Sequence, residues 1–242
     1  MSETSRELLL LGIGDVPGRG DTVTSYLTRA GYRLSTATLP ELPERKPLGI
    51  VLDISPFSHD GWGILLDLKK NHRTRDIPVL PVYLSEEGKV GGIFPVAGFF
   101  ILPLDTEYLL EKLALIGMTD DTEMWDLQTL IVSRKGEESV AKVMITAGFD
   151  VVNAYTGKEA VALASIGPFY MAFSLLMLPD MPAFELLEKC SHHPRTRNLP
   201  IFILMRDELK EGEKKAISRE IPHLVRKKEL SQEEFLLALR RR

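Results

Sequence analysis

The stretch Ile50-Val-Leu-Asp-Ile-Ser-Pro-Phe-Ser-His-Asp-Gly-Trp62 decides how the rest of this sequence is interpreted. It begins with a short apolar run that ends at Asp53, continues through a loop with a proline, and reaches an Asp-Gly pair. Further short apolar runs lie at 8–11 and 79–84, and such runs are typical of strands buried in a parallel sheet. Between them the apolar residues follow helical spacing, so we expect a doubly wound α/β fold with any site at the carboxyl ends of the strands.

The chain contains an internal repeat. The matched pairs are Arg73-Thr-Arg-Asp-Ile-Pro-Val with Arg195-Thr-Arg-Asn-Leu-Pro-Ile, Ala30-Gly-Tyr32 with Ala147-Gly-Phe149, and 107–113 with 233–239. They occur in the same order at nearly constant spacing, and each repeat has the usual size of one domain. We therefore expect two domains of one fold, 1–117 and 127–242, joined by a polar linker at 118–126.

The segment 50–62 resembles the phosphoacceptor segment of response-regulator receiver domains, and Asp76-Ile-Pro-Val follows it as in that family. The second repeat has a similar skeleton in 175–182 and 199–204. The resemblance covers nearly the whole chain. It implies two tandem, degenerate CheY-like domains of flavodoxin-like fold, each with a five-stranded parallel sheet in the order 2-1-3-4-5.

A working receiver, as the resemblance implies, uses an aspartate nucleophile, acidic residues that hold Mg²⁺, a hydroxyl after strand four and a lysine after strand five. In the first domain Asp53 stands at the phosphoacceptor position, and Asp15 is the one acid left to hold Mg²⁺ with it. The hydroxyl position falls on Tyr83, or on Ser85 if the strand is shifted. Leu102 stands where the lysine is expected, so a phosphoaspartate would lack its fixed positive partner.

The second domain has lost more of the site. Leu175 stands at the phosphoacceptor position, Ser133 and Arg134 replace the acidic pair, and Met205 replaces the hydroxyl. Only Lys228 corresponds to the lysine. The resemblance therefore implies that this domain cannot be phosphorylated.

The segment 85–95 of the first domain contains three glycines and a proline. Each of these residues is unfavourable inside a helix, by about 1 kcal/mol for glycine and about 3 kcal/mol for proline. We expect no helix between the fourth and fifth strands of this domain.

The composition excludes several classes of protein. The 242 residues carry a net charge of −4 and one cysteine, Cys190, which rules out an intramolecular disulfide and fits a reducing compartment. No apolar run approaches the roughly 20 residues of a membrane span, and no signal peptide is recognisable. Basic runs at 226–228 and 240–242 lack interleaved aromatic residues, so no nucleic-acid partner is indicated. We expect a cytoplasmic protein.

These observations favour a signal-transduction adaptor that binds a partner protein without phosphoryl transfer and is not an enzyme. No cofactor is required, although Mg²⁺ could bind in the first domain. Two alternatives stay open: a true response regulator phosphorylated on Asp53 by a histidine kinase, and a homodimeric scaffold. On the adaptor hypothesis, Asp53→Asn should leave partner binding nearly unchanged. It could even stabilise the fold slightly, because Asp15 and Asp53 would repel each other.

Overall fold

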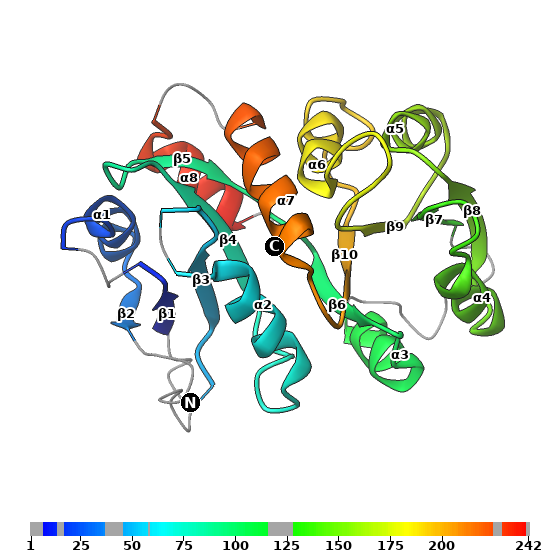
Figure 1. The fold of residues 1–242 in the computed structure, drawn as a ribbon, viewed down its shortest axis with the longest axis horizontal. Coiled ribbons are helices and arrows are strands. Elements are labelled where there is room, and N and C mark those ends of the chain that lie inside the picture. Colours follow the sequence, from blue (N-terminus) through cyan, green and yellow to red (C-terminus); the bar gives the residue numbers. More distant parts are fainter. Residues whose placement is uncertain are drawn as a thin grey trace. The chain divides into compact units, whose positions relative to one another are not determined.

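The structure, a computed structural model, describes residues 7–13, 17–36, 46–57, 59–115, 128–224 and 229–240. The chain divides into two compact units, and each has one five-stranded sheet with helices packed on it (Figure 1). Unit 1 consists of Met1–Pro95 and Leu209–Arg242, whereas unit 2 is the continuous stretch Val96–Glu208. Two α/β units of the same fold class confirm the expected architecture.

The sheet of unit 1 has the strand order β2-β1-β3-β4-β5, which confirms the predicted order 2-1-3-4-5. Its strands are β1 (Glu7–Leu11), β2 (Arg33–Thr36), β3 (Gly49–Asp53), β4 (Val79–Leu84) and β5 (Val90–Ile93). Its helices are α1 (Asp21–Arg29), α2 (Gly61–Lys70), α7 (Glu211–Leu224) and α8 (Gln232–Arg240).

Strand β5 corrects the expectation of a wholly parallel sheet, because it runs antiparallel to β4. The chain reverses through a tight turn in which the Ser85 N–H donates to the Lys89 carbonyl at 2.8 Å. Gly88 has a φ of +78°, a conformation that favours glycine. A short turn of this kind can join only antiparallel neighbours. No helix forms across 85–95, as the glycine content predicted.

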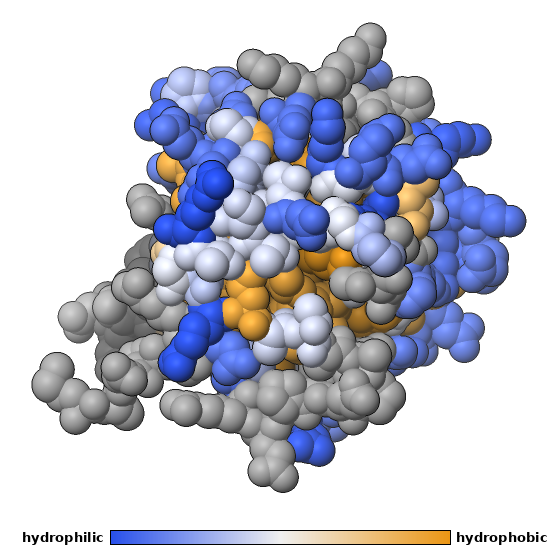
Figure 2. All heavy atoms as spheres, turned by 90° about the vertical axis from the view of Figure 1, so that its left-hand side faces the viewer, coloured by the Kyte–Doolittle hydropathy of each residue, from blue (hydrophilic) through white to orange (hydrophobic). Residues whose placement is uncertain are grey.

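The core of unit 1 is shared between its two segments. Phe235 of α8 is fully buried in the cluster built from β1, α1, β3 and β4. Its ring lies edge-on to Tyr26 at 5.8 Å, and the Tyr26 hydroxyl donates to the Leu230 carbonyl at 3.0 Å. The C-terminal segment is therefore a structural part of unit 1. Hydrophobic side chains of unit 1 also reach the surface, on the side where β2 forms the sheet edge (Figure 2).

Unit 2 has a sheet with the order β6-β10-β9-β7-β8, and every pair of neighbours is parallel. The strands are β6 (Gly98–Leu102), β7 (Gln128–Val132), β8 (Asp150–Ala154), β9 (Met171–Leu175) and β10 (Ile201–Arg206). The helices are α3 (Thr106–Leu115), α4 (Ser139–Thr146), α5 (Gly157–Ile166) and α6 (Ala183–Ser191). Aromatic rings from three adjacent strands pack in its core, with Phe173 and Phe202 stacked at 4.9 Å and Phe100 beside both.

The two units do not follow the domain boundaries predicted at 117 and 127. Strand β6 and helix α3, expected in the first domain, belong to unit 2, and α7 and α8, expected in the second domain, belong to unit 1. The repeat explains the error, because 107–113 and 233–239 have the same apolar pattern and either could complete either unit. The predicted linker at 118–126 lies outside the described residues.

The repeated Arg-Thr-Arg motif has the same structural role in both units. The Thr74 hydroxyl donates to the Leu68 carbonyl at 2.7 Å, and the Thr196 hydroxyl donates to the Cys190 carbonyl at 2.6 Å. Both threonines are buried, whereas Arg73 and Arg195 are exposed. The motif closes the loop after α2 and after α6, so it stabilises the fold.

Candidate functional site

The site predicted in unit 1 lies at the carboxyl ends of β1, β3 and β4. Asp53 is the last residue of β3, and it pairs with Val82 of β4 in the parallel ladder. Its side chain is completely buried. Because parallel strands bring their carboxyl ends to one edge, the loops that follow these strands surround Asp53.

Arg19, in the loop between β1 and α1, occupies the space in front of Asp53. Its Nε and Nη2 atoms donate to Asp53 Oδ2 at 3.1 Å and 3.0 Å. Nη2 also donates to Ser55 Oγ at 2.5 Å, and the Ser55 N–H donates to Asp53 Oδ1 at 2.9 Å. With side-chain exposures of 3% for Arg19 and 0% for Asp53, this is a buried, charge-assisted pair.

The turn after β4 holds the far side of the same guanidinium group. Arg19 Nη1 donates to the Ser85 carbonyl at 2.9 Å, and Nη2 lies 3.3 Å from the Leu84 carbonyl. A Cβ atom added to Gly88 would lie 2.5 Å from the Arg19 carbonyl oxygen. The β4–β5 turn is therefore packed directly against Arg19, and glycine permits the close approach.

Burial raises the pKa of Asp53, whereas hydrogen bonds from Ser55 and then the charge of Arg19 oppose that rise. Removing a carboxylate and a guanidinium from water is costly, and the pair is tolerated because the two charges and the surrounding hydrogen bonds compensate each other. The guanidinium group of Arg19 is buried as well, so it needs the carboxylate of Asp53 in turn. Each residue thus depends on the other.

The described residues do not form a magnesium site. Both oxygens of Asp53 accept hydrogen bonds, and the positive charge that a metal would supply is already provided by Arg19. No group of three or more metal-binding side chains occurs among the described residues. Asp15, the other carboxylate predicted to hold Mg²⁺, lies outside them.

Two aromatic side chains form the outer wall of the site. Phe57 is 45% exposed, and its ring centroid lies 5.7 Å from the Arg19 guanidinium carbon. Phe57 also lies edge-on to Tyr83 at 6.4 Å. Tyr83 is the buried member of this pair, in β4.

Tyr83 and Ser85 are the two residues predicted at the hydroxyl position. The pKa of Tyr83 is raised by burial and, to a lesser extent, by the negative charge of Asp53. Ser85 accepts a hydrogen bond from Arg19 through its carbonyl, while its hydroxyl donates to Glu87 at 2.8 Å.

Asp60 of the Asp-Gly pair has a structural function. Its Oδ1 atom caps α2 by accepting from the Gly63 N–H at 2.9 Å, and its Oδ2 atom forms an ion pair with Lys214 of α7. Partial burial acts to raise the pKa of Asp60, but hydrogen bonds from Lys214 and Gly63 and the charge of Lys214 hold it below its usual value. Asp60 therefore connects the two segments of unit 1.

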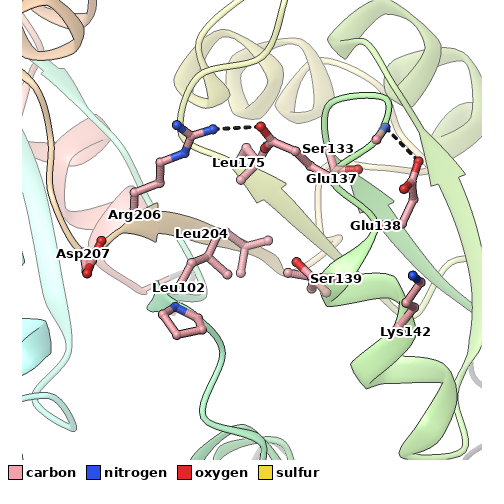
Figure 3. Close-up of a pocket in the computed structure, with 13 residues that line it drawn as sticks. Leu102, Ser133, Glu137, Glu138, Ser139, Lys142, Leu175, Leu204, Arg206 and Asp207 are labelled. Carbon is pink, nitrogen blue, oxygen red and sulfur yellow. Dashed lines mark hydrogen bonds and ion pairs between the residues drawn. The ribbon is translucent and has the colours of Figure 1, made fainter.

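The corresponding edge of unit 2 is an open cleft of about 510 Å³ (Figure 3). Leu175 ends β9 and is buried, and Ser133 and Leu204 line the cleft with it. Leu102 also lines this cleft and pairs with Arg206 of β10, so its predicted position opposite Asp53 was wrong. The physical reason is the one that displaced the domain boundaries: β6 completes the sheet of unit 2.

The other positions predicted in the second repeat are Met205, Arg134 and Lys228. Met205 is fully buried within β10. Arg134 donates through Nη2 to the Met177 carbonyl at 3.4 Å. Lys228 lies outside the described residues.

Arg19 is the residue that sequence reasoning missed. Gly18 and Gly20 flank it, and their spacing is not that of a nucleotide-binding loop. The sequence nevertheless contained a usable signal. This loop follows β1, the place where acidic residues were expected to hold a Mg²⁺ ion that would balance the charge of Asp53. A lone arginine between two glycines at that place supplies the same positive charge directly.

No family model matches the sequence, and no curated protein matches it. Among solved structures, the receiver domain of a sensor histidine kinase from Pseudomonas aeruginosa PAO1 is 16% identical, with a TM-score of 0.31 over 40% of this chain and 98% of that one. The chemotaxis response regulator CheY4 of Vibrio cholerae is 26% identical, with a TM-score of 0.32 over 48% of this chain and 97% of that one. The C-terminus of E. coli RcsC, which contains a linker region and a phosphoreceiver domain, is 13% identical, with a TM-score of 0.28 over 92% and 95% of the two chains. The solved structures similar to this chain thus include response-regulator receiver domains.

Proposed function

We propose that this protein is a signal-transduction adaptor, a tandem pseudo-receiver that binds a partner protein without phosphoryl transfer. The observation that carries this proposal is the buried ion pair between Arg19 and Asp53, with an Nη2–Oδ2 distance of 3.0 Å. The residue at the phosphoacceptor position is used to hold the fold together, so the module keeps its shape without a phosphoryl group.

Phosphoryl transfer to Asp53 would need an oxygen in line with the phosphorus and a cation beside the transferred group. Asp53 has no exposed surface, and its Oδ2 atom already accepts two hydrogen bonds from Arg19. A phosphodonor could reach it only after the Arg19 loop and the β4–β5 turn had moved apart. That opening would break the contacts of Arg19 with Ser85 and Leu84 as well.

The second unit supports the same proposal in a different way. Leu175 supplies no nucleophile, and the lining of its cleft contains three leucines at the ends of neighbouring strands. An adaptor needs a fixed surface, not a reaction, and both units retain the fold while lacking an accessible phosphoacceptor. Catalysis is accordingly not part of the proposed function.

The setting of the adaptor follows from the composition. Cys190, the single cysteine, is buried, and burial raises its pKa to about 11. A thiol of this kind is inert and suits a reducing, cytoplasmic compartment. No helix in the described part of the chain is long and apolar enough to cross a bilayer. We place the adaptor in the cytoplasm with a protein partner and no nucleic acid.

The alternative function is a true response regulator, and the observation that favours it is the position of Asp53 at the end of β3. It requires Arg19 to leave the carboxylate when a donor arrives. The homodimeric scaffold is a third function, and it predicts that the partner captured by the chain is a second copy.

The test captures partners from the native host with wild type and with the double variant Arg19→Met/Asp53→Leu, each with and without acetyl phosphate and Mg²⁺. The double variant removes nucleophile and guanidinium together and leaves no buried charge unpaired. The proposal predicts the same partner protein, in the same yield, in all four captures. Loss of the partner from the double variant, together with a donor-dependent gain in wild type, would establish the response regulator instead.

A further inference from the structure

Unit 1 is completed by a segment that the chain reaches only after it has passed through the whole of unit 2. This segment, 209–242, which we call the C-terminal arm, contains α7 and α8, drawn in orange and red (Figure 1). Among the described residues, the strands of the unit 1 sheet lie within 7–93 and those of the unit 2 sheet within 98–206. The arm can therefore leave unit 1 without opening either sheet.

The arm is held on unit 1 by contacts of its second helix and of the residues just before it. Phe235 of α8 is fully buried, and its ring lies edge-on to Tyr26 of α1 at 5.8 Å. The Tyr26 hydroxyl donates to the Leu230 carbonyl at 3.0 Å, and the Leu230 N–H donates to the Val90 carbonyl of β5 at 2.9 Å. Because two copies of the chain have identical arms, the arm of a second copy can make each of these contacts.

The first helix of the arm adds an ion pair of the same kind. Lys214 of α7 pairs with Asp60, which caps α2 within the N-terminal segment of unit 1. This contact also joins the arm to unit 1 through side chains alone. An arm from a second copy would therefore restore it together with the contacts of α8.

Without an arm, the apolar groove that receives Phe235 is open to water. Val23 and Leu27 of α1 belong to the same buried cluster as Phe235, and both are fully buried. Removing a phenylalanine side chain from such a cluster costs about 3–5 kcal/mol. Unit 1 thus needs an arm in its groove, and the source of that arm is open to exchange.

The connection between the arm and unit 2 has the form of a hinge. Strand β10 ends at Arg206 and α7 begins at Glu211, so residues 207–210 alone join them. Asp207, Glu208 and Lys210 are exposed, so this connection can change direction without loss of core packing. Short hinges between a terminal segment and the rest of a chain are the places where copies of a protein exchange identical elements.

From these features we infer that two copies of this chain exchange their C-terminal arms. In the exchanged dimer, Phe235 of each copy packs on the partner subunit's Tyr26, and Lys214 pairs with the partner's Asp60. The groove of unit 1 is the docking surface, and its occupant is a second copy of the chain. The inference goes beyond the adaptor role and does not depend on it, because a closed and an exchanged unit 1 have the same fold.

The experiment mixes two full-length variants that each lack a different half of the contact. Phe235→Asp disables the arm and Leu27→Asp disables the groove, because each places a carboxylate in the buried cluster. The two chains are unfolded and refolded together, and native mass spectrometry separates their heterodimer from either homodimer by mass. We expect a heterodimer in the mixture and about half of the wild-type unfolding signal of unit 1, since one of its two grooves is filled. Neither variant alone should show a dimer or this signal.

A second measurement uses the wild-type chain and does not depend on how the variants fold. Unlabelled and isotope-labelled chains, refolded together, should form mixed dimers whose fraction rises with protein concentration, because a tethered arm competes at a local concentration on the order of millimolar. The matched control Leu237→Asp, at a position of α8 that is 55% exposed, should retain the mixed dimers, and Phe235→Asp should abolish them.

Three results overturn the inference. The first is a mixture of Phe235→Asp and Leu27→Asp that yields no heterodimer. The second is a wild-type chain that forms no mixed dimer at about 1 mM, the local concentration of a tethered arm. The third is a mixed dimer that persists in Phe235→Asp, which would place the interface outside the groove.

Discussion

The two units of this chain each have one five-stranded sheet but handle the phosphoacceptor position in opposite ways. In unit 1 the acid Asp53 is retained and enclosed by Arg19, so the edge of the sheet is filled and charged. In unit 2 Leu175 replaces the acid, and an open cleft remains, with Leu102, Leu175 and Leu204 in its lining. On the proposed function, a phosphorylation site is lost either by neutralising the nucleophile in place, as in unit 1, or by removing it, as in unit 2. The first route leaves a buried charge that needs its partner.

The largest expected effect is on folding, and it tests which segments of the chain each unit needs to complete its sheet. Fragment 96–208 contains all five strands of the unit 2 sheet, whereas 127–242 lacks β6 and carries α7 and α8 of unit 1. We expect 96–208 to unfold cooperatively in urea and 127–242 to show no cooperative transition, because a domain without an element of its core does not fold. Urea titrations followed by circular dichroism test this. Cooperative folding of 127–242 alone would restore the boundaries predicted from the repeat.

The next effect concerns the buried pair. Arg19→Met and Asp53→Asn should each destabilise unit 1 by about 3–5 kcal/mol, since each leaves one buried charge unpaired. The destabilisation now expected for Asp53→Asn is the opposite of the slight stabilisation expected from the sequence, which relied on Asp15 and did not include Arg19. The double variant Arg19→Met/Asp53→Leu should recover most of the loss, because a leucine fits the equivalent place in unit 2. Denaturant midpoints of the variants give the comparison.

The stability that Arg19→Met loses should depend on pH, and the direction follows from the pKa of Asp53. Burial raises the pKa of Asp53, and without Arg19 nothing but Ser55 opposes that rise. A carboxyl group whose folded-state pKa is raised favours folding at low pH and loses that contribution as the pH rises. The deficit of Arg19→Met relative to wild type should therefore shrink on acidification. A deficit that grows at low pH would contradict a buried, unpaired Asp53 in the variant.

The smallest effect concerns the link between the two segments of unit 1. Asp60→Asn preserves the cap of α2, since asparagine caps as well as aspartate, but removes the ion pair with Lys214. Because Asp60 is 52% exposed, we expect a loss of only about 0.5–1 kcal/mol at neutral pH. The pKa of Asp60 is lowered in the folded state, so this stabilisation disappears as the pH falls through that pKa. Wild type and variant should therefore be equally stable at strongly acidic pH.

The sequence predicted the fold class, the strand order of unit 1 and the place of Asp53, because buried runs and the segment 50–62 depend on local patterns. It could not predict that β6 joins unit 2 or that Phe235 joins unit 1, because equivalent segments of a repeat have interchangeable apolar faces. It also missed Arg19, since the partner of a buried charge is set by three-dimensional proximity across 34 residues of sequence. A retained acid at a strand end therefore predicts a functional site only when the cation that balances its charge is also known.

The most direct test of the enclosed phosphoacceptor is intact-protein mass spectrometry after incubation with acetyl phosphate and Mg²⁺. A phosphorylatable receiver domain in the same tube serves as the positive control, and Asp53→Asn serves as the blank. If Arg19 keeps Asp53 enclosed, the wild-type chain gains no phosphoryl mass while the control receiver does. A phosphoryl group on the wild-type chain, mapped to Asp53 and absent from Asp53→Asn, would show that the arginine yields to a donor and that unit 1 is a working receiver.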